Sequence, residues 1–349
     1  MNNRWYDIPK QTKLNAYTEI AENTGMTTYV VEKDWWVIQI LTVIFEMEIG
    51  EFLIFKGGTS LSKAWGLIER FSEDVDLAFD RAYLGFDKNL TRSGIKRLRK
   101  ETGKYISKVF SPELEARLKE SGLTDITLNY IKPGASDTDP VQIEIYYPNV
   151  TEYPGYIRPR ILLEISCSSL REPNAVRAFS SLLDEHYSES SFACHPIKVP
   201  TAIPGRTFLE KIFLLHEEFH RPHKKIRVNR LSRHLYDVYQ LLKTDYALKA
   251  INDKKLYEII VKHRYTHNRI GEIDYNLHQP QTINPVPIPE FIDAWKADYK
   301  TMQEQMIYGD SPTFNDMIDA IKDFTVNKIN KLDWQMEVEF PKPEIHSKK

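Results

Sequence analysis

The stretch FKGGTSLSKAWGLIERFSEDVDLAF, residues 55–79, carries the densest structural signal in the chain. It opens at the end of an apolar run, Phe52–Lys56, which stops at Gly57 and Gly58, and the residues that follow are compatible with a helix. Asp74–Phe79 then alternates in the manner of a half-buried strand. The sequence therefore predicts a strand, a glycine turn, a helix and a second strand in close succession.

The predicted glycine turn suits a phosphate group. Where a strand ends in glycines and a helix begins, unpaired backbone N–H groups and the positive end of the helix dipole face a ligand with no side chain in the way. Gly57 and Gly58 allow the close approach, and Thr59 and Ser60 add hydroxyl donors. The spacing is neither that of a P-loop nor GxGxxG, so an ordinary tight turn remains the alternative.

Two carboxylates follow on the second predicted strand. Asp74 and Asp76 stand at i and i+2, which points both side chains to one face. Mg²⁺ prefers hard oxygens and is commonly held by one or two carboxylates plus substrate phosphates. A DxD pair alone is more often a solvated surface pair. After a turn that suits phosphate, it predicts a metal ion bridging carboxylates and phosphate.

Together these residues resemble the G-G/S…DxD signature of the DNA-polymerase-β-like nucleotidyltransferase superfamily. More narrowly, KGGTSLSK…RFSEDVDL resembles the AbiEii/AbiGii toxin family. The resemblance includes further segments and covers most of residues 27–330: VEKDWW, FLEKIFLLHE, RHLYDVYQLL and, at its widest extent, DYKTMQEQMIYGDSPTF. It implies an α+β fold, in which a nucleotidyltransferase-type mixed sheet with flanking helices is followed by a helical C-terminal half.

The resemblance also implies which residues form the site. Asp74 and Asp76 would be catalytic and would hold metal ions, Mg²⁺ or Mn²⁺. Residues of the turn and of two helices would contact the NTP substrate: Gly57, Gly58, Thr59, Ser60, Lys63 and Lys211.

The superfamily usually supplies a third carboxylate from a later strand, completing a two-metal site. Glu164 in RILLEIS and Glu144 in VQIEIYY are the candidates, and both sit among apolar neighbours. We prefer Glu164 as the third catalytic and metal-binding carboxylate, because the family order of strands places this acid just before the helical half. The alternative is a Glu164 paired with Arg160 or with a lysine.

Two further catalytic residues are expected in the helical half. The family carries a lysine that reaches the triphosphate, and Lys211 matches it, with a solvated helix lysine as the alternative. Asp237 matches the family's acidic position, and a salt bridge with Arg233 is its alternative. The segment His216–His220, HEEFH, also matches the HExxH motif of zinc proteases formally, but that activity needs a third ligand.

Basic residues gather in two runs. Residues 92–108 hold seven Lys or Arg against the single acid Glu101, and residues 221–233 hold six and no acid. The second run is predicted to be a flexible link between the helices of Lys211 and Asp237 that clamps a phosphodiester backbone. A solvated face is the alternative for both runs.

The remaining pattern predicts a mixed α/β front half and a helical back half. Expected helices are 12–24, 27–48, 92–120, 205–220, 230–244, 253–264, 288–307 and 313–330, and the additional strands are 124–131, 141–147 and 160–166. We expect a nucleotidyltransferase domain at 1–203, a helical domain at 204–335 and a mobile tail at 336–349.

Composition limits the class of protein. With 349 residues the chain is long enough for two or three packed units, and a net charge of −2 leaves no global cationic field. Two cysteines cannot build a disulfide framework, and the most apolar stretch, 35–47, is too short to span a bilayer. The N-terminus lacks a signal-peptide core, so we expect a soluble cytoplasmic protein without a membrane partner.

These observations predict a metal-dependent nucleotidyltransferase that moves a nucleoside monophosphate from an NTP to an acceptor hydroxyl. The resemblance implies the toxin of a bacterial toxin–antitoxin or abortive-infection system, with a cognate antitoxin and an RNA acceptor, the tRNA 3′ end among the candidates. The alternative is a catalytically silent nucleotide- or antitoxin-binding module, which the intact DxD argues against.

Overall fold

The computed structural model describes residues 5–72, 74–87, 90–153 and 158–343. The chain forms two compact units. Unit 1 holds the residues up to Gly66 together with Arg70–Ala202, and unit 2 holds Leu67–Glu69 and the residues from Ile203 onward.

Unit 1 is built on a mixed seven-stranded sheet with the strand order β3-β4-β5-β2-β1-β7-β6. The strands are β1 Leu53–Lys56, β2 Asp74–Phe79, β3 Thr127–Tyr130, β4 Val141–Tyr146, β5 Arg160–Ser166, β6 Asn174–Phe179 and β7 Ile197–Ala202. The central strand β2 pairs antiparallel with β1 and parallel with β5, and β1 runs parallel to β7. The mixed sheet predicted from the sequence is confirmed.

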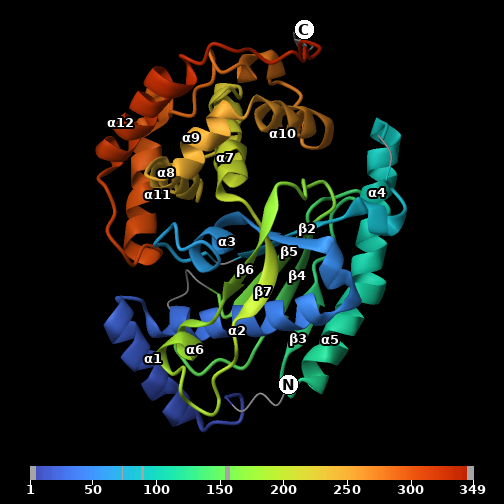
Figure 1. Ribbon diagram of the computed structural model, residues 1–349, viewed down its shortest axis with the longest axis vertical. Coiled ribbons are helices and arrows are strands. Elements are labelled where there is room, and N and C mark those ends of the chain that lie inside the picture. The colour runs from blue at the N-terminus through green and yellow to red at the C-terminus, as the bar shows by residue number, and fades with distance from the viewer. Residues whose placement is uncertain (1–4, 73, 88–89, 154–157, 344–349) are drawn as a thin grey trace. The chain divides into compact units, whose positions relative to one another are not determined.

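Helices accompany this sheet, and Figure 1 shows α2 lying across it. The helices of unit 1 are α1 Lys10–Thr24, α2 Thr28–Glu46, α3 Gly57–Lys63, α4 Arg92–Tyr105, α5 Ser111–Glu120 and α6 Leu182–His186. A π-helical turn, Ile106–Phe110, joins α4 to α5. The predicted helix 92–120 is therefore present as one nearly continuous element.

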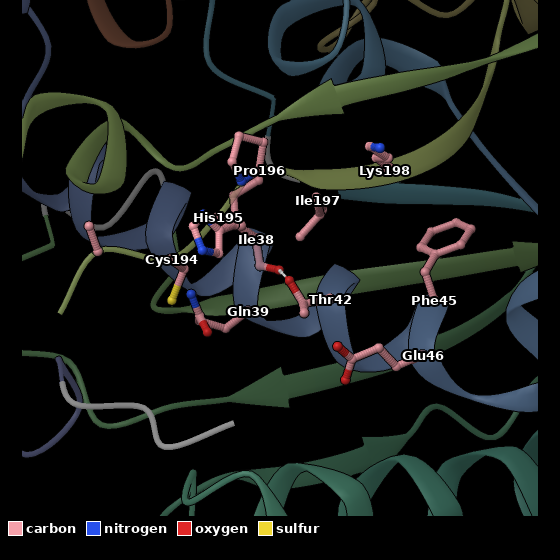
Figure 2. Close-up of a pocket in the computed structure, with 11 residues that line it drawn as sticks. Ile38, Gln39, Thr42, Phe45, Glu46, Cys194, His195, Pro196, Ile197 and Lys198 are labelled. Carbon is pink, nitrogen blue, oxygen red and sulfur yellow. Dashed lines mark hydrogen bonds between the residues drawn. The ribbon is translucent and has the colours of Figure 1, made fainter. Parts of the chain in front are cut away.

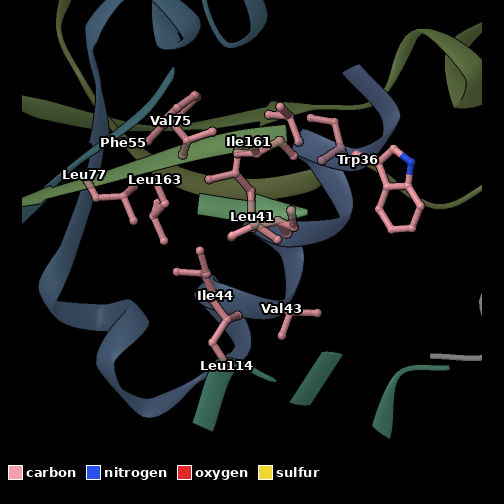
Figure 3. Close-up of a cluster of buried hydrophobic side chains, with 14 of the residues drawn as sticks. Trp36, Leu41, Val43, Ile44, Phe55, Val75, Leu77, Leu114, Ile161 and Leu163 are labelled. Carbon is pink, nitrogen blue, oxygen red and sulfur yellow. The ribbon is translucent and has the colours of Figure 1, made fainter. Parts of the chain in front are cut away.

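The core of unit 1 lies between α2 and one face of the sheet. Alternate residues of β2, Val75 and Leu77, pack with Leu41 and Ile44 of α2 in a single buried cluster (Figure 3). Burying each such side chain contributes about 1.5–3 kcal/mol. Because strand residues alternate between faces, the polar residues of β2 are left on the opposite face of the sheet.

The strands β6 and β7 were not predicted from the sequence. Pro200 lies inside β7 and lacks the N–H of a regular ladder residue, so its segment reads as a linker. In the structure β7 is an interior strand between β1 and β6, and Pro200 stands opposite Val176. The sheet consequently extends two strands further than the sequence pattern indicates.

Unit 2 is helical. Its helices are α7 Pro204–Phe219, α8 Ser232–Leu242, α9 Asp245–Asn252, α10 Lys254–His267, α11 Ile292–Gln305 and α12 Phe314–Phe324. The sequence did not predict α9. No helix within the described ranges has the length and apolar character that crossing a bilayer requires.

The predicted tail differs from the structure in its first part. Met336 and Phe340 are buried, and their N–H groups donate to the side chains of Gln279 and Asn276. These contacts hold this part of the segment to unit 2. The last predicted tail residues, 344–349, lie outside the described residues.

Candidate active site

Two carboxylates predicted from different parts of the sequence are neighbours across the sheet. In the parallel pairing of β2 and β5, Asp76 stands directly beside Glu164, and Asp74 stands beside Leu162. Side chains at facing positions of paired strands project from the same face. The structure therefore brings Asp74, Asp76 and Glu164 together on the sheet face turned away from α2.

The surroundings of Glu164 are short of positive charge. Burial and the nearby negative charges of Asp76 and Asp74 raise the pKa of Glu164 to about 7. The Gln142 side-chain amide donates to its carboxylate, and Lys56 lies 3.9 Å from Asp76. Sequence reasoning missed both of these residues, although Lys56 directly precedes the glycine turn.

The donor set fits a divalent cation. Three carboxylates supply the hard oxygens that Mg²⁺ and Mn²⁺ accept, and a cation would relieve their mutual repulsion. Within the described ranges, no three His, Cys, Asp or Glu side chains are arranged to hold a metal ion in the conformation observed. In this conformation, Lys56 is paired with Asp76 and Gln142 is bonded to Glu164.

Glu144, the alternative third carboxylate, has other partners. It receives a hydrogen bond from Asn129 and forms an ion pair with Arg160, whose Nε lies 3.0 Å away. Burial raises its pKa, but these partners outweigh burial and leave the pKa lowered. Arg160, the expected partner of a non-catalytic Glu164, thus pairs with Glu144.

The glycine turn touches the carboxylates. Gly57 has φ +77°, a conformation that L side chains rarely adopt, and a Cβ there would collide with the carboxylate of Asp76. A Cβ on Gly58 would lie 2.6 Å from Nη2 of Arg70, a buried guanidinium that sequence reasoning also missed. A Cβ at Gly57 would therefore clash with Asp76, and a Cβ at Gly58 would clash with Arg70.

The hydroxyls of Thr59 and Ser60 donate to main-chain carbonyls in this structure. Thr59 donates to the main-chain carbonyl of Asp74, and Ser60 donates to the carbonyl of Gly57 at 2.9 Å. Both residues are buried, and buried hydroxyls need partners within the protein. Thr59 thereby fastens the turn to β2 and Ser60 closes a hydrogen bond within the turn, and their contacts with phosphate stay predictions.

Lys63 likewise has a protein partner. Its ammonium lies 2.8 Å from Oδ1 of Asp34, and the other carboxylate oxygen of Asp34 accepts the N–H of Leu182 at 2.7 Å. Asp34 belongs to the segment VEKDWW, which had no assigned role. In this structure Lys63 ties α3 to α2, and its predicted contact with NTP stays a prediction.

Lys211 and Asp237 meet in unit 2. The ammonium of Lys211, on α7, lies 2.8 Å from Oδ2 of Asp237, on α8, and 3.3 Å from Nδ1 of His234. Asp237 is fully buried. The two residues predicted separately as catalytic therefore form one buried ion pair.

The HEEFH segment is part of the core of unit 2. Glu217 makes two hydrogen bonds with Arg264, at 2.6 and 2.7 Å, and His216 accepts the N–H of Asn284 through Nδ1. Burial raises the pKa of Glu217, but the Arg264 guanidinium prevails and lowers it to about 2. Glu217 is thus held as a structural anion, which does not suit the general base of a zinc protease.

The basic link 221–233 is more constrained than predicted. Arg221 and Arg227 both pair with the buried Glu218, at 3.0 and 2.7 Å, and Lys225 pairs with Glu272. Two acids outside the link, Glu218 and Glu272, thereby pair with three of its cations and balance two of its six positive charges. The predicted contact of this link with a phosphodiester backbone stays a prediction, with fewer uncompensated cations than its sequence suggests.

A cavity of about 420 Å³ in unit 1 lies between α2 and the segment Ala193–Lys198 (Figure 2). Ile38, Gln39 and Thr42 of α2 line one side of it, next to Cys194. None of the predicted site residues lines this cavity.

Solved structures and a protein family are similar to this chain. Among solved structures, the nucleotidyltransferase toxin MenT4 from Mycobacterium tuberculosis is 16% identical, with a TM-score of 0.44, over 90% of this chain and 98% of its own. A putative nucleotidyltransferase from H. pylori is 14% identical, with a TM-score of 0.37, over 87% and 96%. No curated protein matches the sequence. Residues 39–326 match the AbiEii family, the nucleotidyl transferase toxins of type IV toxin–antitoxin systems, so the predicted family is confirmed and the chain belongs to it.

Proposed function

We propose that this nucleotidyltransferase toxin moves a nucleoside monophosphate from an NTP to a hydroxyl of RNA, with the tRNA 3′ end as a candidate acceptor. The observation that carries the proposal is the register that sets Asp76 beside Glu164, with Asp74 one pleat away. Asp74, Asp76 and Glu164 would hold Mg²⁺ or Mn²⁺. When bound, such ions neutralise the charge that develops on the attacking and leaving oxygens.

The chain's own residues have distinct parts in this proposal. Gly57 and Gly58 would offer main-chain N–H groups to the phosphate oxygens, and the absence of a Cβ at Gly57 lets the turn lie against Asp76, while Thr59 and Ser60 keep the turn in place. Lys56 balances part of the negative charge of Asp76 before substrate binds. Contacts of Lys63 and Lys211 with the NTP remain predictions, as does a positioning part for Asp237.

Family membership implies an NTP substrate and an antitoxin counterpart. We propose that the protein works in the cytoplasm and that the halves 1–203 and 204–335 act as separate domains. A silent nucleotide-binding module is the second candidate. The presence of Asp74, Asp76 and Glu164 on one face of neighbouring strands favours catalysis over that candidate.

The test incubates the purified full chain with each of the four NTPs, labelled at the α-phosphate, with Mg²⁺ or Mn²⁺ and total cellular RNA. Label on RNA supports the proposal and identifies the NTP. Label on protein would show that the acceptor is a protein and not RNA. NTP binding without transfer would support the silent module, and neither binding nor transfer would contradict both candidates.

A further inference from the structure

The helix α4 presents a row of cations on its outer face. Its members, and Lys108 in the π-helical turn that follows, recur every four residues and are all exposed. We call this row the α4 ridge: Arg92, Lys96, Lys100, Lys104 and Lys108. Lys104 pairs with Glu101 at 2.7 Å. The other four form no ion pair with the described residues, although Lys100 lies close enough to Glu101 to help lower the pKa of that carboxyl.

The opposite face of α4 fixes the ridge to the sheet of unit 1. Ile95 and Leu98 are buried, and Nε of Arg99 donates to Oγ of Ser168 at 3.1 Å. Ser168 lies four residues beyond Glu164, just past the end of β5. The ridge therefore lies on a packed helix whose inner face contacts the segment just past β5, the strand that carries Glu164.

The two basic runs of the sequence differ in how many of their cations pair with acids. In 221–233, Arg221, Lys225 and Arg227 are paired with acids from elsewhere in unit 2. In the α4 ridge, only Lys104 has such a pair among the described residues. Uncompensated cations create the local positive potential to which a polyanion responds.

We propose that the α4 ridge binds the phosphodiester backbone of the RNA acceptor strand, an inference that rests on the proposed function. Residues four apart rise about 6 Å along a helix, so the ridge offers regularly spaced charges over about 24 Å. Such a row suits a polymer with one charge per repeat better than a compact anion. A membrane fits less well, because Ile95 and Leu98, which could insert into lipid, are buried against the protein.

The experiment compares three triple alanine variants of the full chain, each carrying three fewer positive charges. The first removes Arg92, Lys96 and Lys100 from the ridge. The second removes Lys224, Lys225 and Arg227 from the link. The third, a matched surface control, removes Arg117, Lys119 and Lys249, which pair with acids on their own helices. Binding of a fluorescent single-stranded RNA and of anionic phospholipid vesicles is measured across a salt series.

The ridge variant should bind RNA more weakly than wild type at low salt, and its log–log salt slope should fall by about 2, at about 0.7 for each phosphate that is no longer neutralised. The surface control should keep the wild-type slope, and NTP KM should stay unchanged in both. If the ridge variant keeps the wild-type slope, the inference is wrong. RNA labelling by wild type would in that case still support the proposed function. A reduced slope in the link variant alone, or ridge-dependent binding of anionic vesicles without RNA binding, also overturns the inference. If wild type neither binds nor labels RNA, the proposed acceptor itself is wrong.

Discussion

The ammonium of Lys63 lies 2.8 Å from the carboxylate of Asp34, and both side chains are largely buried. Lys63 ends α3, the helix that begins at the glycine turn, while Asp34 lies in the buried helix α2. Because Asp34 also accepts the N–H of Leu182, its position is fixed from two sides. The pair thus holds α3, and with it the turn, against the core of unit 1.

Lys63→Met and Asp34→Asn should therefore lower the free energy of unfolding by similar amounts. Each leaves a buried partner without its counter-charge, which costs about 3–5 kcal/mol, and the double variant should lose much less than the sum of the two. Denaturant unfolding measures the free energies of unfolding, and NTP titration measures affinity. If Lys63 instead binds NTP directly, Lys63→Met alone would weaken NTP binding and Asp34→Asn would not.

Gly57→Ala should abolish transfer. An alanine at φ +77° is strained, and its Cβ collides with the carboxylate of Asp76, so the carboxylate must move. Gly122 offers the matched control, because it has φ +91° but nothing within 4 Å of an added Cβ. Gly122→Ala should cost some stability and leave the transfer rate near wild type. Equal transfer rates in both variants would show that Gly57 is not part of the active site.

The sequence allowed the local part of the site to be predicted. Asp74 and Asp76 share a face because alternation along a strand needs no distant information. The pairing of Asp76 with Glu164 depends on the register of two strands far apart in the chain, which spacing does not contain, and only the family resemblance favoured Glu164. The partners of Thr59 and Lys63 were missed for the same reason, since a donor does not show which acceptor folding will bring to it.

Charge runs were the least predictable feature. The link 221–233 holds no acid of its own, so its sequence suggested free cations, but the structure places Glu218 and Glu272 on them. Pro200 misled in a different way, because a residue without an N–H argues against an interior strand although β7 accommodates it. Both errors arise where tertiary contacts override a local rule.

Lys211→Met should destabilise unit 2 as well as alter catalysis. It leaves the fully buried carboxylate of Asp237 without the ammonium 2.8 Å away, which costs about 3–5 kcal/mol. Lys211→Met with Asp237→Leu should recover part of the stability, since no buried charge is then left unpaired. Thermal unfolding of wild type, the single variant and the double variant checks this. A single variant as stable as wild type would show that the pair is not formed in solution.

Stability should fall as the pH drops below about 6.5. Burial lowers the pKa of His216, as do the neighbouring His278 and His220, and burial also lowers the pKa of His278. Near pH 6.5 these histidines bind protons in the unfolded chain but stay neutral in the folded chain, so acidification favours unfolding. Glu217, with a pKa of about 2, adds a further loss only at lower pH.

His216→Asn tests this dependence, because the Asn oxygen can still accept the N–H of Asn284. The variant should lose less of its melting temperature than wild type between about pH 7.5 and about pH 5.5. Glu120, which is exposed and pairs with Arg117, provides a control: Glu120→Gln should keep the wild-type pH dependence. Parallel curves for His216→Asn and wild type would exclude His216 as a source.

Nucleotidyl transfer at Asp74, Asp76 and Glu164 is tested most directly by following the two ends of the triphosphate separately. Wild type and the variants Asp76→Asn and Glu164→Gln are incubated with RNA, Mg²⁺ and the accepted NTP, labelled at either the α- or the γ-phosphate. We expect the α-label on RNA and the γ-label in pyrophosphate for wild type, and neither for the variants, whose melting temperatures should stay near wild type. Transfer of the γ-label to the acceptor, or full activity in either variant, would contradict nucleotidyl transfer by these carboxylates.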